Sequence, residues 1–469
     1  MMTNAPLLLW FRRDLRVTDL PMLSEALATG RPVMPVFILD PETESIGAAA
    51  LWRLGLGVEA FAATLERMGS RLILRRGPAL DVLERLIAET GAAGVFWSRS
   101  YDPATRPRDE AVKAGLKARG LLAQSFPGFL LHEPWEIETG QGGFFKVYTP
   151  FWRVASKRPV PPSLAAPAFL PEPPAWPQSD RLQDWNLGAR MRRGAAVMAP
   201  HQRVGEAKAL ARLEEFIGQR IGAYGEARDM MAEDATSGLS ENLTYGEISP
   251  RRIWHAGYRA LEEGQAGAEQ FLKELVWREF AWALLHHTPH IAQSNWKPDW
   301  DGFPWGMESD KAEAWRRGMT GEPVIDAAMR QLYVTGKMHN RARMLVGSYL
   351  TKHLMTHWKI GLDWFADTLT DWDPAANAMG WQWVAGSGPD AAPYFRIFNP
   401  ATQAEKFDPA KTYRRRWLAE FSRDPLALSY FDAVPKSWAL DPARPYPRPI
   451  VSLEAGRALA LASYAQRKA

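Results

Sequence analysis

Acidic, amide and indole side chains gather in one segment of the sequence, from Thr370 to Phe407. Asp371 and Asp373 stand directly before a stretch of helical character, in which Asn377 and Trp381 are four residues apart and share one face. Acids at the start of a helix often cap its free amides and complement its dipole. Capping explains one of the two acids, but it does not explain why an amide and tryptophans occur in the same segment. We therefore treat the segment as a candidate functional site.

A second cluster lies upstream, in the sequence KELVWREF. Glu274, Trp277 and Arg278 stand at positions i, i+3 and i+4, which places them on one side of a helix. The structural alternative is a surface ion pair between Glu274 and Arg278, which would contribute only about 0.3–0.5 kcal/mol. The neighbouring tryptophan favours a functional interpretation.

Two further segments combine groups that suit phosphate. The sequence MHNRARM supplies Asn340, Arg341, Arg343 and Met344, which join cations to an amide and a soft thioether. Taken alone, it is also compatible with an ordinary basic helix.

The sequence ATSGLSENL offers the hydroxyls of Thr236, Ser237 and Ser240, together with backbone amides, at the entry to a helix. Such an entry can hold a phosphate. Ordinary Ser/Thr capping of the helix is the alternative for this segment.

Other common chemistries are excluded or disfavoured. The chain has no cysteine, which rules out disulfides, thiolate nucleophiles and cysteine-type metal sites. It also lacks the nucleophile-elbow, P-loop and H-E-x-x-H motifs. His286, His287 and His290 could suggest a metal, but we favour a helix C-terminus with cations near its carbonyls, and we expect no metal.

The elements that must position these residues differ between the two halves of the chain. Short apolar runs alternate with helical stretches in the first part, at Leu7–Phe11, Val33–Leu39, Arg71–Arg75 and Gly94–Trp97. This alternation predicts a Rossmann-like parallel α/β sheet. Long helical periods at 205–217, 270–285, 324–335 and 341–353 predict an all-α second part.

Eight prolines within the nineteen residues 159–177 disfavour a helix or a central strand and predict an extended tether. The chain is therefore predicted to be α/β plus all-α, with an α/β domain at 1–135, a linker at 136–200 and a helical domain at 201–469. With 46% apolar residues, a net charge of only +4 and no signal peptide or spanning segment, we expect a folded cytoplasmic protein.

Seven sequence motifs then carry a resemblance to a known family: WFRRDLR, FKVYTPFW, ATSGLS, WREF, MHNRARM, DWDPAANAMGWQW and YFRIFNP. In order and spacing they resemble the photolyase/cryptochrome family over nearly the whole chain. Within it, the sequence looks most like a class I cyclobutane pyrimidine dimer photolyase. The resemblance implies an N-terminal antenna domain and a C-terminal domain that binds FAD without a covalent bond.

The resemblance also implies roles for individual residues. The FAD-binding residues would be Tyr224, Thr236, Ser237, Gly238, Leu239, Ser240, Arg343, Asp371, Asp373 and Asn377. Asn377 matches the amide that faces flavin N5. Trp381, Trp358 and Trp305 match an electron-transfer triad, which would account for some of the 21 tryptophans. The active form would be FADH⁻, which donates an electron to the dimer and recovers it after the ring opens.

For the lesion, the resemblance implies that Glu274 contacts the pyrimidine edge, that Trp277 and Trp383 form aromatic walls, and that Met344 fills the gap beside them. The residues implied for the damaged strand are Arg228, Asn340, Arg341, Gln403 and Lys406. The partner would be UV-damaged DNA. The protein would bind it as a monomer and would not associate with a membrane.

The antenna chromophore stays open at this point. Ala104 and Thr105 stand where folate-binding members have an Asn-Glu pair, and Leu51 stands where deazaflavin or FMN binders often have an arginine, with Arg53 out of register. A second chromophore is therefore unidentified, and its presence is undecided.

Three rival functions remain. A signalling cryptochrome often has a long C-terminal tail, whereas here only a short helical ending follows YPRPIV. A (6-4) photolyase has a histidine where this chain has methionines such as Met338 and Met344. A flavoprotein without light chemistry would leave the three aligned tryptophans unexplained. We expect repair of cyclobutane dimers.

Overall fold

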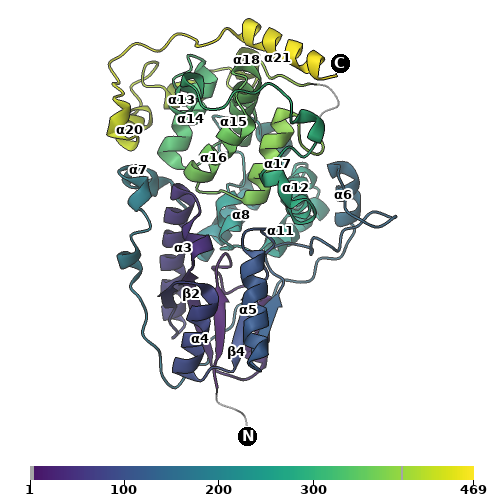
Figure 1. The fold of residues 1–469 in the computed structure, drawn as a ribbon, viewed down its shortest axis with the longest axis vertical. Helices are drawn as coiled ribbons and strands as arrows, with labels where there is room; N and C mark the ends of the chain where they lie inside the picture. The colour runs from purple at the N-terminus through teal and green to yellow at the C-terminus, as the bar shows by residue number, and fades with distance from the viewer. Residues whose placement is uncertain (1–4, 392–394, 469) are drawn as a thin grey trace.

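The computed structural model describes residues 5–391 and 395–468. Figure 1 shows a sheet with its helices at the N-terminal end and a larger helical region above it. The described residues form one five-stranded sheet, with all pairs parallel and the order β3-β2-β1-β4-β5. Its strands are β1 (Leu7–Phe11), β2 (Val33–Leu39), β3 (Ile73–Arg76), β4 (Gly94–Ser98) and β5 (Leu122–Phe126). The predicted α/β class is confirmed.

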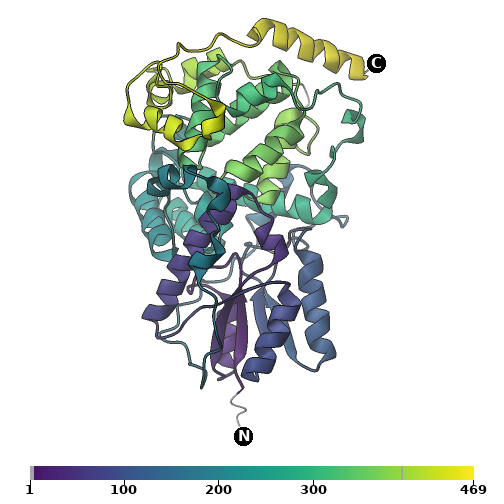
Figure 2. The same ribbon diagram turned by 60° about the vertical axis from the view of Figure 1, so that its left-hand side comes forward.

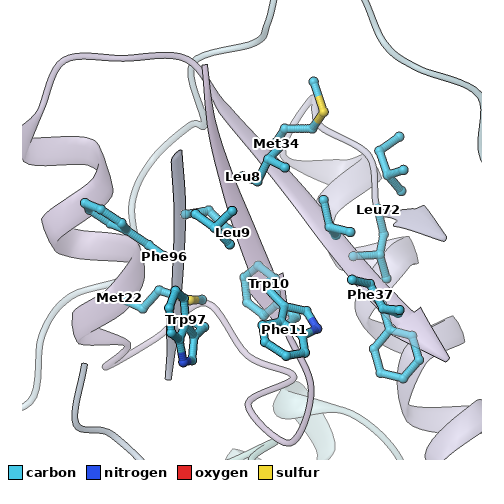
Figure 3. Close-up of a cluster of buried hydrophobic side chains, with 14 of the residues drawn as sticks. Leu8, Leu9, Trp10, Phe11, Met22, Met34, Phe37, Leu72, Phe96 and Trp97 are labelled. Carbon is cyan, nitrogen blue, oxygen red and sulfur yellow. The ribbon is translucent and has the colours of Figure 1, made fainter. Parts of the chain in front are cut away.

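The central strands are buried at every position, which explains their unbroken apolar runs. Figure 3 shows how Trp10 and Phe11 of β1 lie beside Phe37 of β2 and Trp97 of β4. The sequence analysis missed β5, because this edge strand alternates exposed and buried residues and has no continuous apolar run.

Helices cover the sheet on both sides (Figure 2). They are α1 (Pro21–Ala28), α2 (Pro41–Glu44), α3 (Ala48–Arg67), α4 (Ala79–Thr90) and α5 (Arg106–Ala118). Among the described residues, α3 is the one helix long and apolar enough to cross a membrane, and most of it is buried inside the protein.

A buried ion network joins α3 to the helical region. The Arg53 guanidinium contacts the Glu241 carboxylate and lies 2.7 Å from that of Glu247. Both acids come from the segment around residues 240–247, so this arginine holds the two halves of the chain together. Because Arg53 is paired with these two carboxylates, it is not available to bind an antenna chromophore.

The predicted linker is not uniform. Between residues 159 and 177 the chain has no helix or strand, and Figure 1 shows it passing outside the sheet region toward α7 (Gly194–Met198). Earlier in the same stretch, however, α6 (Tyr148–Ala155) packs on the helical region through Tyr148, Phe151 and Ala155. These three positions share one helix face, which gives α6 a buried side. The domain boundaries themselves stay a prediction.

The helical region contains α8 (Glu206–Gln219), α9 (Tyr224–Ala227), α10 (Ser240–Thr244), α11 (Pro250–Glu262), α12 (Ala268–His287), α13 (Asp310–Arg316), α14 (Pro323–Thr335), α15 (Asn340–Ser348), α16 (Trp358–Thr368), α17 (Pro374–Ala385), α18 (Pro400–Phe407), α19 (Thr412–Trp417), α20 (Pro425–Ala433) and α21 (Leu453–Lys468). The four predicted long helices correspond to α8, α12, α14 and α15, and α15 ends five residues before the predicted end at 353. Short 3₁₀ turns occur at 182–185, 189–191, 199–201, 221–223, 289–292, 298–300 and 436–438, and a wide π turn spans 349–353.

Helix α17 is central to this region, because it contacts α12, α15 and α16. Its buried residues lie on several sides rather than along one stripe, as expected for a helix surrounded by others. The predicted site segment is therefore held on a rigid element in the interior.

Candidate active site

A cavity of about 550 Å³ opens beside α17. Its volume falls within the roughly 300–1,000 Å³ common for small-molecule sites. Ten residues singled out from the sequence line it: Arg228, Trp277, Asn340, Arg343, Met344, Asp371, Asp373, Asn377, Trp381 and Trp383. The tertiary structure thus brings together groups from α12, α15, α17 and the turn before α17.

Asp371 is the centre of a small charged network at this cavity. Its carboxylate accepts hydrogen bonds from Arg343 Nη2, at 2.7 Å from Oδ2, and from the Ser240 hydroxyl at 2.7 Å. Arg343 is itself held by the Met338 carbonyl, 2.9 Å from Nε. The acid and the cation are therefore fixed with respect to each other before any ligand binds.

Asp373 confirms the capping interpretation of its position. One carboxylate oxygen accepts from the amides of Ala375 and Ala376, at 3.0 and 2.9 Å, at the start of α17. The other oxygen accepts from Trp282 Nε1 at 2.9 Å. Because the side chain also lines the cavity, capping and a site role coincide in this residue.

The amide of Asn377 has a defined orientation. Its Nδ2 donates to the Leu362 carbonyl of α16 at 3.0 Å, which identifies the nitrogen and leaves the amide oxygen for another partner. Nearby, the indole N–H groups of Trp372 and Trp381 are buried without an acceptor in the part of the chain that the structure describes. Both residues line the cavity, so its wall fits a ligand that brings hydrogen-bond acceptors.

The loop before α10 lies outside the lining of this cavity and meets it through the Ser240–Asp371 bond. Arg212 binds the carbonyls of Thr236 and Ser237, at 2.7 and 2.8 Å. In a trans peptide the N–H points away from the C=O, so the amides of Ser237 and Gly238 face away from Arg212.

Neither of those two amides donates to another backbone carbonyl among the described residues. The loop therefore keeps free donors for an anion. In contrast, the rings and side chains of Tyr224 and Leu239 are buried in the helical core, where Tyr224 meets Phe216 and Phe271 edge to face. These two side chains support the loop from the helical core and do not line the cavity.

Of the three predicted triad tryptophans, Trp381 and Trp358 are buried and Trp305 is partly exposed. Trp381 also lines the cavity. Two backbone bonds of 2.8 Å, from Gly306 to the Met355 carbonyl and from His357 to the Gly306 carbonyl, join the Trp305 loop to the start of α16. The electron route through the three indoles stays a prediction.

Glu274 lies next to the cavity, and its role at the lesion stays a prediction. It pairs with Arg228 and accepts from Gln270 Nε2 at 2.7 Å, and it is not among the cavity-lining residues. The alternative pair with Arg278 is wrong, because that arginine donates to the Phe129 carbonyl at 3.0 Å. Burial alone would lower the pKa of Arg228, but the attraction of Glu274 outweighs it and raises that pKa.

The predicted strand-binding residues fall into two groups. Arg228 and Asn340 lie at the cavity, while Arg341 and Lys406 both lie over the ring of Phe407, at 4.3 and 5.2 Å. Gln403 belongs to α18, the helix that ends with this phenylalanine. The structure therefore assembles a polar and cationic surface from α15 and α18 next to the cavity.

The cavity lining also contains residues that the sequence analysis did not single out, among them the indole of Trp372 and the charged Asp390 and Arg396. Trp372 stands between the two acids of the DWD motif, so its position was a usable signal. Asp390 and Arg396 come from the Gly- and Pro-rich segment after α17, whose path no periodic pattern predicts.

A second cavity of about 200 Å³ lies between the sheet and the helical region. Arg12, Arg108, Ala104 and Thr105 line it from the sheet side. Trp372 lines both this cavity and the larger one, so the two cavities share this residue.

For metals, the described residues contain no group of three or more His, Cys, Asp or Glu placed to hold an ion. His286 and His287 lie in the last turn of α12, near its C-terminal carbonyls. The placement agrees with the predicted helix end, but burial lowers the pKa of His286 to about 4, so its imidazole is neutral near pH 7 and the interpretation as a cation is wrong for this residue.

Comparison with protein families gives two matches along the chain. Residues 7–172 match the family model described as DNA photolyase, and residues 271–466 match the model described as the FAD binding domain of DNA photolyase. Together they cover the sheet region and the helices that surround the larger cavity.

Individual relatives extend over nearly the full length. A deoxyribodipyrimidine photo-lyase of Agrobacterium fabrum is 44% identical, covering 99% of this chain and 98% of the relative. Cryptochrome-2 of Arabidopsis thaliana is 33% identical over 98% of this chain and 78% of its own length. Among solved structures, a bacterial class III photolyase from Agrobacterium tumefaciens has a TM-score of 0.90 and 42% identity, covering 99% of this chain and 98% of that one.

Proposed function

The chain belongs to the DNA photolyase/cryptochrome family, and from this membership we propose that it repairs cyclobutane pyrimidine dimers in UV-damaged DNA under light. The observation that carries the proposal is the larger cavity. It combines an indole wall from Trp277 and Trp383 with the fixed Arg343–Asp371 pair and the oriented amide of Asn377. Such a cavity suits a flavin on one side and two flat bases on the other.

FAD is the cofactor of the matched domain, and when bound in its reduced form it supplies light absorption and the electron that opens the cyclobutane ring. The protein positions it. The amides of Ser237 and Gly238 would hold phosphate oxygens, while Arg343 and Asp371, which is held by the Ser240 hydroxyl, would hold the polar part next to them. Asn377 would present its amide to the ring nitrogen without adding charge.

Access to the lesion requires the dimer to leave the DNA stack. Enzymes that act on a base within a duplex extrude it into a pocket, and photolyases are counted among them. Trp277 and Trp383 would receive the two rings, and Met344 would fill the remaining gap. Arg228, Arg341 and Lys406 would contact phosphates of the strand, so binding should weaken with salt and be indifferent to sequence.

The predicted triad would serve to reduce the bound cofactor. Trp381 would be the electron donor nearest the flavin, and Trp305 and then Trp358 would pass an electron inward to it from the surface. An external thiol would supply that electron and would itself be oxidised. The increasing exposure from Trp358 to Trp305 supports this direction.

Two alternatives are retained. A signalling cryptochrome is a rival because Cryptochrome-2 is similar over 98% of this chain. A (6-4) photolyase is less well supported, because Met344 occupies the cavity where that activity would need a histidine. The class I resemblance stays a prediction, and the similar class III structure makes class III the competing assignment.

The smaller cavity is our candidate site for a second, antenna chromophore. Ala104 and Thr105 line it, and the shared Trp372 places it directly behind the larger cavity, which suits transfer of excitation energy. We further propose that the protein acts in the cytoplasm and that it is a monomer. Size-exclusion chromatography of the purified protein tests the oligomeric state.

One experiment decides the main proposal. The purified protein, reduced and loaded with FAD, is mixed with an oligonucleotide that contains a thymine dimer and is exposed to blue light. Restored thymines are measured against a dark control and against an oligonucleotide with a (6-4) photoproduct. Light-dependent repair of the dimer alone is expected. FAD binding without repair would favour the signalling alternative, and repair of only the (6-4) product would overturn the lesion assignment.

A further inference from the structure

The indole of Trp277 is covered on one face by the ring of Tyr148. Their centroids are 3.7 Å apart and the planes are inclined by only 9°. Phe280 meets both rings edge to face, at 5.9 Å from Tyr148 and 5.7 Å from Trp277. Trp277 also lines the larger cavity, so its aromatic surface is shared between this packed stack and the cavity.

Tyr148 is held at both ends. Its hydroxyl donates to the Lys273 carbonyl at 2.6 Å, one turn before Trp277 on α12. Its backbone amide donates to Asp390 Oδ1 at 3.3 Å. Tyr148 is buried, and burial raises the pKa of its hydroxyl, so the hydroxyl stays a neutral donor. The ring therefore cannot slide along the helix without losing hydrogen bonds.

Asp390 connects this stack to the opposite wall. Its side chain accepts from Tyr148, and its backbone carbonyl accepts from Trp383 Nε1 at 3.0 Å. The residue has a φ of +52°, a left-handed conformation that aspartate and asparagine tolerate better than most residues. Asp390 thus links the end of α17 to Tyr148 of α6, which is 242 residues away in the sequence.

We propose that Tyr148 and Asp390 are positioning residues that hold Trp277 and Trp383 at one separation, so that a pair of linked bases enters a preformed gap. The inference rests on the proposed function, because it concerns how the same cavity receives a lesion. Neither residue needs to touch the reacting bonds.

The physical reason is preorganisation. A tryptophan that is free to change rotamer loses that freedom on binding, which reduces affinity. Without the Tyr148 ring, the Trp277 indole could also turn into the vacated space and present its edge to the cavity. Ordering one side chain on binding corresponds to roughly a 2- to 10-fold change in affinity.

The test compares dissociation constants for dimer-containing and undamaged oligonucleotides at one salt concentration. Tyr148→Leu should weaken binding of the damaged DNA by roughly 2- to 10-fold and leave binding of undamaged DNA unchanged. Tyr148→Phe, which keeps the ring, should retain most of the affinity. Phe151→Leu is the matched control, because that ring packs on Phe280 from the same helix, with centroids 5.2 Å apart.

Asp390 supplies an independent pair of variants. Asp390→Asn keeps an acceptor for the Tyr148 amide and tolerates the positive φ, so it should behave like the parent protein. Asp390→Ala removes the acceptor and should lose selectivity for damaged DNA. Circular dichroism and FAD content identify any variant that fails to fold, and the remaining variants still decide the question.

A double-mutant cycle shows whether Tyr148 acts through Trp277. In a Trp277→Ala background, Tyr148→Leu should have no further effect on affinity. Additive effects, or unchanged selectivity in both Tyr148→Leu and Asp390→Ala, would overturn the inference. If the parent protein itself fails to prefer dimer-containing DNA, the proposed function fails instead, so the two failures are distinguishable.

Discussion

The backbone of Gly361 lies against the indole of Trp381. A Cβ atom added at Gly361 would lie 2.0 Å from Cη2 of that ring, and further ring carbons would be 2.4 Å away. Gly361 is one turn after Trp358 on α16, so the missing side chain lets Trp381 pack directly against the helix that carries Trp358. The φ of Gly361 is not positive, so the backbone conformation does not require glycine. The lack of space for a Cβ atom does.

Gly361→Ala should therefore displace Trp381 and slow photoreduction of oxidised FAD. Repair by chemically pre-reduced protein should change less, because it does not use the triad. Gly218→Ala, at an exposed position on α8, is the control, since a Cβ there meets no atom within 4 Å. Equal photoreduction in both variants would show that the close contact is unimportant for electron transfer.

Trp381→Phe should abolish photoreduction, because phenylalanine is much harder to oxidise than indole. Pre-reduced Trp381→Phe should still repair dimers under light. Flavin absorption during illumination with an external thiol provides the measurement. Normal photoreduction in this variant would contradict the proposed electron route, while the family membership would stand.

Trp277→Ala should weaken the preference for damaged DNA by roughly 5- to 150-fold, the range expected from loss of about 1–3 kcal/mol of base stacking. Binding isotherms at fixed salt provide the measurement. A second indole far from the cavity, changed to alanine in Trp176→Ala, controls for a general loss of stability. Unaltered selectivity in Trp277→Ala would remove this residue from the lesion site.

Glu274→Ala should lower the number of dimers repaired per absorbed photon severalfold and change affinity less. In the proposed function its carboxylate would act on charge that develops only after electron transfer, and such groups affect the reaction more than binding. Because Glu274 pairs with Arg228, the variant also frees that cation, and Arg228→Gln in the same background separates the two effects. A full repair yield in Glu274→Ala would assign this acid to structure alone.

The stability of the protein should depend on pH through Glu279. Burial raises the pKa of this carboxyl to about 7, against the opposing attraction of Arg278 and the amides of His132 and Leu131. The folded state therefore keeps its proton up to about pH 7, whereas the unfolded chain releases it near its ordinary pKa of 4.5. Stability should fall as pH rises through this window, by roughly 3 kcal/mol from this group.

Glu279→Gln removes the ionisation, so its Tm should change less between pH 5 and pH 8 than that of the parent protein. Glu262→Gln, at an exposed position on α11, is the control and should keep the parent pH dependence. Identical pH dependence in all three proteins would contradict a proton held by Glu279.

The sequence alone was sufficient for features that depend on local patterns. Continuous apolar runs predicted four of the strands, since a parallel strand covered on both faces has no polar side. Helical periods predicted the long helices, and the position of Asp373 predicted a helix cap that the structure confirms. The order of seven motifs was enough to indicate the family, which the comparisons confirm.

Only the tertiary structure decided which side chains meet. Glu274 could pair with Arg278 one turn away, yet it pairs with Arg228, 46 residues away. The stack of Tyr148 on Trp277, the link through Asp390 and the contact of Gly361 with Trp381 likewise join distant segments. The physical reason is that helical spacing limits only neighbours within about one turn, whereas long-range partners depend on how whole helices pack around the cavity.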